Sequence, residues 1–131
     1  MSLPLAAPLV ISAGAIPGAL IRYYVTLLLV RRLGVRFPYG TVVVNLSGAL
    51  LIGFVSTWAL GLSQSSLIGP DLQLLLVTGF LGSYTTFSTY ALDTANLARR
   101  HRLLALGYWA GSIIGGAISL EAGIMLAQRM L

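Results

Sequence analysis

Long apolar runs separated by short polar connectors dominate the sequence. Four runs can be delimited, covering residues 9–30, 41–62, 72–97 and 103–126. Each exceeds the roughly 20 residues that a helix needs to cross a hydrocarbon core of about 30 Å. None of the connectors is long enough for an extramembrane domain. The pattern therefore predicts an all-α integral membrane protein in which residues 1–131 form a single domain of four transmembrane helices.

The third run contains a polar segment near its centre, GFLGSYTTFSTYALD, which extends from Gly79 to Asp93. Thr85 and Thr86 within it are β-branched and hydroxylic, and such residues propagate a helix poorly. In lipid, a break is tolerated only where protein or water satisfies the released backbone groups. The segment predicts a helix broken near mid-membrane, whose carbonyl groups can hold a cation and whose second half can turn its N-terminus toward an anion. A kink without a ligand is the alternative interpretation.

The composition fits a membrane setting and excludes several classes of function. Hydrophobic residues make up 57% of the chain and charged residues 8%, which is too little charge to cover a soluble domain. The chain has no cysteine, so disulfides, thiol nucleophiles and cysteine metal sites are excluded. No pairing of nucleophile and base and no cofactor cradle is recognisable, so we do not expect an enzyme. The net charge of +5 comes from arginines in short clusters between the runs, which favours membrane topology over nucleic-acid binding.

The arginines outside the runs are distributed unevenly. The first and third connectors contain Arg31, Arg32, Arg36, Arg99, Arg100 and Arg102. The remaining one, Arg129, follows the fourth run. By the positive-inside rule, the two basic connectors are cytoplasmic and both ends of the chain face outward. The imbalance predicts that the chain inserts mainly in one orientation.

Polar and charged residues inside the runs are candidates for function, because they are costly in lipid. They are Arg22, Asn45, Asp93 and Glu121. Three have a structural alternative: Arg22 can snorkel to the interface, Asn45 can join helices by hydrogen bonding, and Glu121 lies close to the end of its own run. Arg22 and Asp93 fall in the same half of the membrane, so we hypothesise that they interact, directly or through water.

Glycines recur at helical spacing in two of the runs. Gly14 and Gly18 are four positions apart, and Gly107, Gly111 and Gly115 repeat this spacing. Small residues in this pattern let helix backbones approach closely. They serve either packing within one subunit or contact between subunits. Because four helices provide few walls for a water-filled path, we expect a dimer or a larger assembly.

Three segments together resemble a known family. GFLGSYTTFSTY is similar to the third-helix signature of the CrcB/Fluc fluoride channels, which reads roughly Gly-Phe-x-Gly-Gly-x-Thr-Thr-Phe-Ser-Thr-Phe. GAIPGALIRYY resembles the glycine-rich segment of the family's first helix, and GTVVVNLSGALLIG resembles its second helix. The matches occur in order and at family-like spacing over about the whole chain.

The resemblance implies a passive fluoride-selective channel that exports cytoplasmic fluoride and gives fluoride resistance. The family is embedded in the bilayer of the cell inner membrane or plasma membrane and assembles as a dimer of antiparallel subunits with inverted topology. The second subunit would be an identical chain or an oppositely oriented paralogue.

The resemblance also implies roles for residues that match the family pattern. Arg22 would lie at the base of an aqueous vestibule and draw anions in. Asn45 would point its amide donors toward the permeating ion. Phe87 would be the first pore phenylalanine, and Ser88 and Thr89 would form a polar track beside it.

Two backbone positions would hold a cation. In the family pattern, the carbonyl groups of Gly82 and Thr85 would contact a structural sodium ion at the dimer centre. Three nearby residues depart from the pattern. Ser83 replaces a glycine beside the presumed cation site, and Tyr90 replaces the second phenylalanine and would bring a hydroxyl near the ion path. Asp93 stands where many members have glutamate.

These departures keep two alternatives in view. A non-conducting or partner-dependent subunit of a heterodimeric fluoride channel would tolerate them, because its two halves need not be identical. A small proton-coupled multidrug exporter has a similar size and helix number, but it needs an acidic residue in its first helix. Residues 1–30 contain no such residue.

Overall fold

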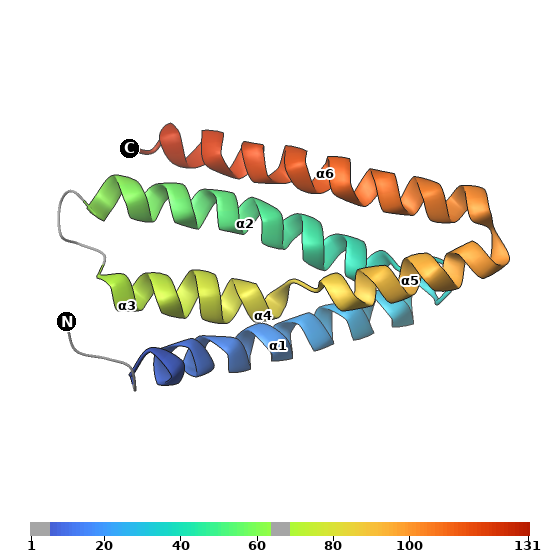
Figure 1. Cartoon of the computed structure of the whole chain (residues 1–131), viewed down its shortest axis with the longest axis horizontal. Coiled ribbons are helices and arrows are strands. Elements are labelled where there is room, and N and C mark those ends of the chain that lie inside the picture. The colour runs from blue at the N-terminus through green and yellow to red at the C-terminus, as the bar shows by residue number, and fades with distance from the viewer. Residues whose placement is uncertain (1–5, 64–68) are drawn as a thin grey trace.

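The computed structural model of the chain describes residues 6–63 and 69–131, and every regular element in these ranges is helical (Figure 1). The elements are α1 (Ala6–Leu33), α2 (Tyr39–Ser63), α3 (Pro70–Gln73), the π-helix η1 (Leu74–Leu81), α4 (Gly82–Tyr84), α5 (Phe87–Arg100) and α6 (Arg102–Gln128). Part of the connector between α2 and α3 therefore lies outside the described residues.

Three helices in the described part of the chain are long and apolar enough to cross a membrane: Ala6–Leu33, Tyr39–Gly61 and Arg102–Gln128. They contain almost all of the first, second and fourth apolar runs, so these three predictions are confirmed. The first and last of these helices extend slightly beyond their runs at both ends, because the backbone ladder continues after the side chains become polar. The chain is therefore a helical protein with several membrane-spanning elements.

The third run does not form one continuous helix. The segments α3, η1, α4 and α5 follow one another along the bundle, with a gap between α4 and α5 (Figure 1). Thr85 has φ −75° and ψ 159°, and Thr86 has φ −147° and ψ 120°, so both residues are extended. The interruption expected from the polar segment is thus confirmed at these two threonines. The π-helix before it was not anticipated.

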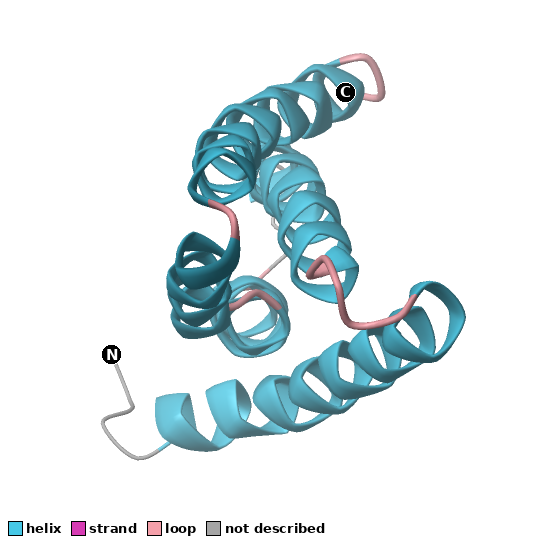
Figure 2. Ribbon diagram, turned by 90° about the vertical axis from the view of Figure 1, so that its right-hand side faces the viewer, coloured by secondary structure: helices cyan, strands magenta, loops and turns pink. Residues whose placement is uncertain are grey.

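Helices pack in two close pairs, α1 with η1 and α2 with α6. Viewed along the bundle, α1 and α6 lie on opposite sides, and the other helices lie between them (Figure 2). A Cβ atom at Gly79 would lie 2.5 Å from the Ile11 carbonyl oxygen, and one at Gly123 would overlap the Leu50 carbonyl oxygen. The two helix pairs therefore depend on direct backbone contact at these glycines, which have no side chain to keep the helices apart.

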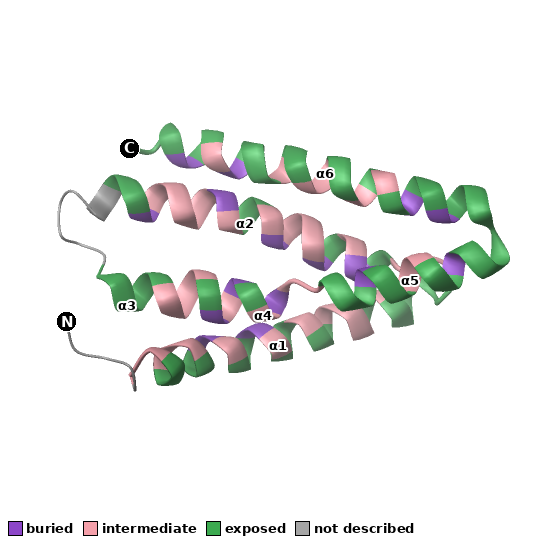
Figure 3. Ribbon diagram, viewed as in Figure 1, coloured by how far each residue is buried: buried purple, intermediate pink, exposed green. Residues whose placement is uncertain are grey.

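The first glycine pair packs within the subunit, and the second series is divided. A Cβ at Gly115 would lie 3.0 Å from Leu46 Cδ2 of α2, whereas Gly107 and Gly111 face outward. Gly14 and Gly18 face the η1–α4 segment, where an added Cβ would overlap the carbonyl oxygens of Leu75 and Phe80. Packing within one subunit therefore accounts for this pair. Gly107 and Gly111 are exposed, and no atom of the described residues lies within 4 Å of a Cβ added at either. Much of the outer surface of α6 is exposed in the same way (Figure 3).

The two ends of the bundle differ in charge. The connector between α1 and α2 and the one between α5 and α6 lie at the same end, and the start of α1 and the end of α6 lie at the other (Figure 1). The six connector arginines are therefore gathered at one end of the molecule, as the sequence predicted. Near this end, α5 packs on α6 through a buried cluster of Tyr90, Leu97, Ala105 and Tyr108.

Candidate functional site

Asn45 of α2 fastens the interruption between α4 and α5. Its Nδ2 donates a hydrogen bond to the Thr86 carbonyl oxygen at 2.9 Å, and its Oδ1 accepts one from the Thr86 backbone N–H at 2.8 Å. One side chain thus satisfies both backbone groups of an extended residue that has left the helical ladder. The break is therefore a fixed feature held by another helix and not a loose kink.

We call the two hydrogen bonds between Asn45 and Thr86 the clamp. The clamp leaves a carbonyl group of the preceding turn without its helical hydrogen bond. In a continuous helix the Thr86 N–H would bond to the carbonyl oxygen of Gly82, four residues earlier. Because that N–H is donated to Asn45, the Gly82 carbonyl loses its helical donor. The Thr85 carbonyl oxygen accepts a hydrogen bond from Arg22 Nη1 of α1 at 3.3 Å. The carbonyls of Gly82 and Thr85 thus both lack their helical donors, since the Thr86 and Thr89 N–H groups bond to side chains.

The helix restarts with a side-chain cap. Thr86 Oγ1 accepts a hydrogen bond from the Thr89 backbone N–H at 3.2 Å and lies 3.0 Å from Thr89 Oγ1. This is the usual role of threonine at an N-cap, and it begins α5 directly after the break. Phe87 follows with 79% of its surface exposed, and Ser88 and Thr89 are also exposed.

A small cavity borders the break. It measures about 250 Å³, and its lining comprises Asn45, Ala49, Ile52, Thr85, Thr86 and Phe87. The cavity thus brings together a side-chain amide, the extended backbone and an aromatic ring. One N–H of the Asn45 amide is bonded to Thr86, and the second has no partner among the described residues. This arrangement can offer N–H and aromatic-edge groups to a small anion.

Tyr90 contacts both Phe87 and α6. Its ring lies 5.8 Å from that of Phe87 between centroids, at an angle of 50°. Its hydroxyl donates to the Trp109 carbonyl oxygen of α6 at 2.9 Å, and the residue is buried. The hydroxyl therefore joins α5 to α6, and the expectation that it lies near the ion path stays a prediction.

The Ser83 side chain, which replaces a glycine of the family pattern, is directed to α1. Its Oγ lies 2.8 Å from the Ala15 carbonyl oxygen of α1 and 3.0 Å from the Phe80 carbonyl oxygen. Gly18 leaves the space that this side chain occupies, since a Cβ there would overlap Ser83 Oγ. The added side chain thus joins the broken helix to α1, and it does not project toward the released carbonyls.

Arg22 and Asp93 have separate partners. Arg22 donates to the break, whereas Asp93 Oδ2 accepts a hydrogen bond from Thr41 Oγ1 at 2.6 Å. Among the described residues the two side chains form no ion pair with each other. The hypothesis of a direct interaction is thus not supported, because each group is already engaged. An interaction through water stays a prediction.

Two further contacts near the site were missed by the sequence analysis. Thr41, beside Asp93, is buried, and the Ser47 and Tyr84 hydroxyls lie 2.9 Å apart between α2 and α4. Thr41 and Ser47 are small hydroxylic residues in an apolar run, which usually bond to their own helix. Only the pairing of α2 with the broken helix reveals their partners.

The fold and site together define a helical membrane protein with one helix broken and clamped at two threonines. The family model described as CrcB-like protein, Camphor Resistance (CrcB), matches residues 9–124. Two relatives, each named a fluoride-specific ion channel FluC, extend this result. The one from Trichormus variabilis is 52% identical over 122 residues, covering 92% of this chain and 88% of the relative. The one from a Synechocystis species is 47% identical over 131 residues, covering 99% and 98%. The chain belongs to the CrcB-like family.

Proposed function

We propose that this chain forms a passive fluoride-selective channel that exports cytoplasmic fluoride and thereby gives fluoride resistance. The similarity to relatives named fluoride-specific ion channels supports the substrate. The observation that carries the mechanism is the clamp between Asn45 and Thr86, because it preorganises the break and leaves an amide N–H at its cavity. The chain is an ion channel and not an enzyme.

The same elements support a membrane arrangement for this channel. In this proposal the three long helices cross the bilayer, and the broken series from Pro70 to Arg100 crosses as the fourth, with its break near mid-membrane. A second subunit of opposite orientation completes the pore. The exposed hydroxyls of Ser88 and Thr89, which lipid serves poorly, and the small-residue surface at Gly107 and Gly111 support such a partner.

The anion route uses groups that can replace the water around fluoride. Arg22 attracts the ion toward the break, and the second N–H of Asn45 donates to it. The ring edge of Phe87 carries partial positive charge, and the exposed hydroxyls of Ser88 and Thr89 can turn their hydrogens toward an anion. Tyr90 contributes its ring, because its hydroxyl is bonded to α6.

A structural sodium ion at the dimer centre fits the broken backbone. Among the described residues no group of three or more His, Cys, Asp or Glu side chains could hold a metal, so a cation would depend on carbonyl oxygens. The Gly82 carbonyl lacks its helical donor, and Thr85 keeps a lone pair besides the one bonded to Arg22. When bound, the ion would supply fixed positive charge between the two subunits.

Transport by the purified chain tests the channel proposal. Liposomes that contain only this chain and are loaded with equal fluoride and chloride should lose fluoride and retain chloride. Ion-selective electrodes measure both anions, and liposomes without protein correct for leakage. Comparable loss of chloride would contradict selectivity, and efflux that requires a proton gradient would instead indicate a coupled exporter.

The charge difference between the two ends favours a second candidate, a partner-dependent subunit. A chain that builds an antiparallel dimer from itself should insert in both orientations, so it should carry little charge bias. Six connector arginines at one end and Arg129 at the other give a strong bias. In this second candidate, a paralogue whose basic connectors favour the opposite orientation supplies the other half of the channel. A homodimer that assembles despite the bias is the competing possibility.

Single-cysteine labelling distinguishes the two assemblies. Ser65, in the connector between the second and third runs, lies outside the described residues, so we choose exposed Gly69 of the same connector. The chain has no cysteine of its own, which makes Gly69→Cys a unique site. We expect labelling almost entirely from outside the cell when the chain is expressed alone. Comparable labelling from both sides would establish dual insertion and remove the argument for a paralogue.

A further inference from the structure

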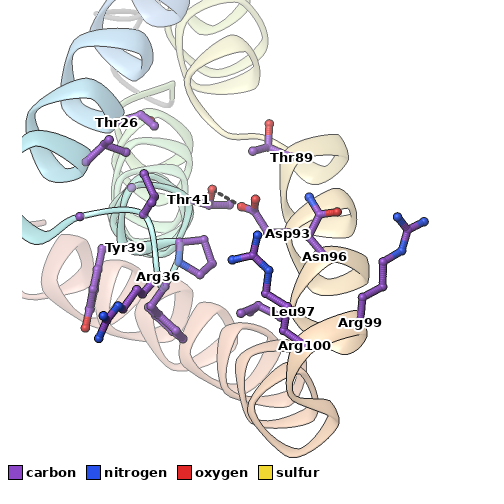
Figure 4. Close-up of a pocket in the computed structure, with 16 residues that line it drawn as sticks. Thr26, Arg36, Tyr39, Thr41, Thr89, Asp93, Asn96, Leu97, Arg99 and Arg100 are labelled. Atoms are coloured by element: carbon purple, nitrogen blue, oxygen red, sulfur yellow. Dashed lines mark hydrogen bonds between the residues drawn. The ribbon is translucent and has the colours of Figure 1, made fainter.

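A second cavity lies at the end of the bundle that carries the basic connectors. It measures about 530 Å³ and is bordered by the end of α1, the connector to α2, the start of α2 and the outer part of α5 (Figure 4). It exists because α5 packs on α6 after the break and makes little contact with α1. Its volume lies within the range of about 300–1,000 Å³ that is usual for small-molecule sites. We refer to it as the connector cavity.

Positive charge dominates the lining of the connector cavity. Arg36 comes from the first connector, and Arg99 and Arg100 come from the last turn of α5. Against these three stands one carboxylate, Asp93, which is hydrogen-bonded to Thr41. Among the described residues, none of the three guanidinium groups has a hydrogen-bond or ion-pair partner. The cavity thus presents unpaired donors suited to the oxygens of a phosphate group.

Apolar side chains beside these arginines indicate a lipid as the source of the phosphate. Val30 and Val35 line the cavity and are 39% and 79% exposed, respectively. Tyr39 also lines it and is 41% exposed, which suits an aromatic residue at headgroup depth. Exposed valines add nothing to the binding free energy of a soluble phosphate, whereas a lipid can bury them under its glycerol and acyl groups.

We propose that the connector cavity binds the headgroup phosphate of an anionic phospholipid. Arg36 and Arg100 contact the phosphate from two different elements, and the lipid chains pass along Val30 and Val35. The six arginines at this end place it at the membrane face that the positive-inside rule assigns to the cytoplasm, where anionic lipids attract basic segments. The proposal concerns a lipid site and does not depend on which ion the chain conducts.

Native mass spectrometry of the purified chain in neutral detergent tests this site. The chain is titrated separately with phosphatidylglycerol and with phosphatidylcholine of the same acyl chains. We expect selective retention of phosphatidylglycerol, and binding weakened about tenfold or more in the double variant R36Q/R100Q, which loses charge-assisted hydrogen bonds. Its matched control, R31Q/R102Q, removes two exposed arginines from the same end that do not line the cavity, and it should bind as the parent chain does.

Three outcomes would overturn the proposal. Equal retention of the two lipids would show no recognition of an anionic headgroup. Equal weakening by the two double variants would show attraction to diffuse surface charge in place of a defined cavity. Full competition by an equal concentration of glycerol phosphate would identify a site for soluble phosphate. Size-exclusion profiles of both variants verify that neither loss of binding arises from misfolding.

Discussion

Replacing Asn45 with alanine is expected to lower fluoride efflux by about 100-fold or more and to destabilise the folded chain. The variant loses both hydrogen bonds that hold the Thr86 peptide, leaving one backbone donor and one acceptor without partners. A fully buried polar group without a partner costs about 1–3 kcal/mol, and the Thr86 peptide is part-buried, so the loss in unfolding free energy from its two groups should reach roughly 2–4 kcal/mol. Efflux from liposomes and thermal unfolding in detergent measure the two effects.

Two further variants separate the clamp from the ion contact. Asn45→Asp retains an oxygen that can accept from Thr86 N–H, but it removes the donor and places negative charge at the break. It should therefore keep more stability than the alanine variant while conducting no better. Gln128→Ala removes an exposed amide at the end of α6 and should change neither property. Near-normal efflux by the Asn45→Ala chain would refute a role for the clamp in conduction.

The helices that cross the membrane were predictable because lipid imposes a simple rule. Backbone groups in lipid must be bonded within the segment, so an apolar run of sufficient length has to be helical. The run at residues 103–126 became α6 (Arg102–Gln128), with small differences at its ends. The break was predictable for the opposite reason, since Thr85 and Thr86 combine poor helix propensity with side chains that can bond elsewhere.

The partners of the break were not predictable, because they depend on contacts between distant parts of the chain. Asn45 was recognised as a candidate, but nothing in its neighbourhood indicates that both ends of its amide bind the Thr86 peptide. The orientation of Ser83 is a similar case. Its hydroxyl turns to α1 because Gly18 leaves room there, and that space exists only once the two helices pack. The local sequence shows which hydrogen-bonding groups are present, and the packing of the helices determines their partners.

The π-helix η1 is another feature that could not be predicted from the sequence. Its sequence, LLLVTGFL, is strongly apolar and carries no mark that separates it from an α-helix. It lies where Gly79 brings the broken helix against the backbone of α1. Wider turns of this kind occur mostly as local adjustments and often near functional sites. Here the adjustment directly precedes the released carbonyl of Gly82, so it belongs to the same structural unit as the break.

Valine substitutions at two glycines of α6 should have different effects. The one at Gly123 should impair folding, and the one at Gly111 should impair dimer assembly. Gly123→Val is expected to prevent stable packing of α2 on α6. Its side chain would overlap the Leu50 carbonyl oxygen and lie 2.8 Å from the Phe54 backbone nitrogen, and backbone atoms cannot move aside as a flexible side chain can. Overpacking of a tight contact usually costs about 1–3 kcal/mol, so the variant should unfold at a clearly lower temperature or fail to be recovered from the membrane.

Gly111→Val provides the matched comparison, because it makes the same chemical change on the same helix. Among the residues that the structure describes, no atom lies within 4 Å of a Cβ at Gly111, so the chain should fold with a thermal stability close to that of the parent. If a second subunit covers this surface, as we propose, the added side chain should instead separate the subunits. Chemical crosslinking in liposomes should then show fewer dimers for Gly111→Val. An unchanged dimer fraction would place the subunit interface away from Gly111, and normal stability of Gly123→Val would contradict the close packing of α2 on α6.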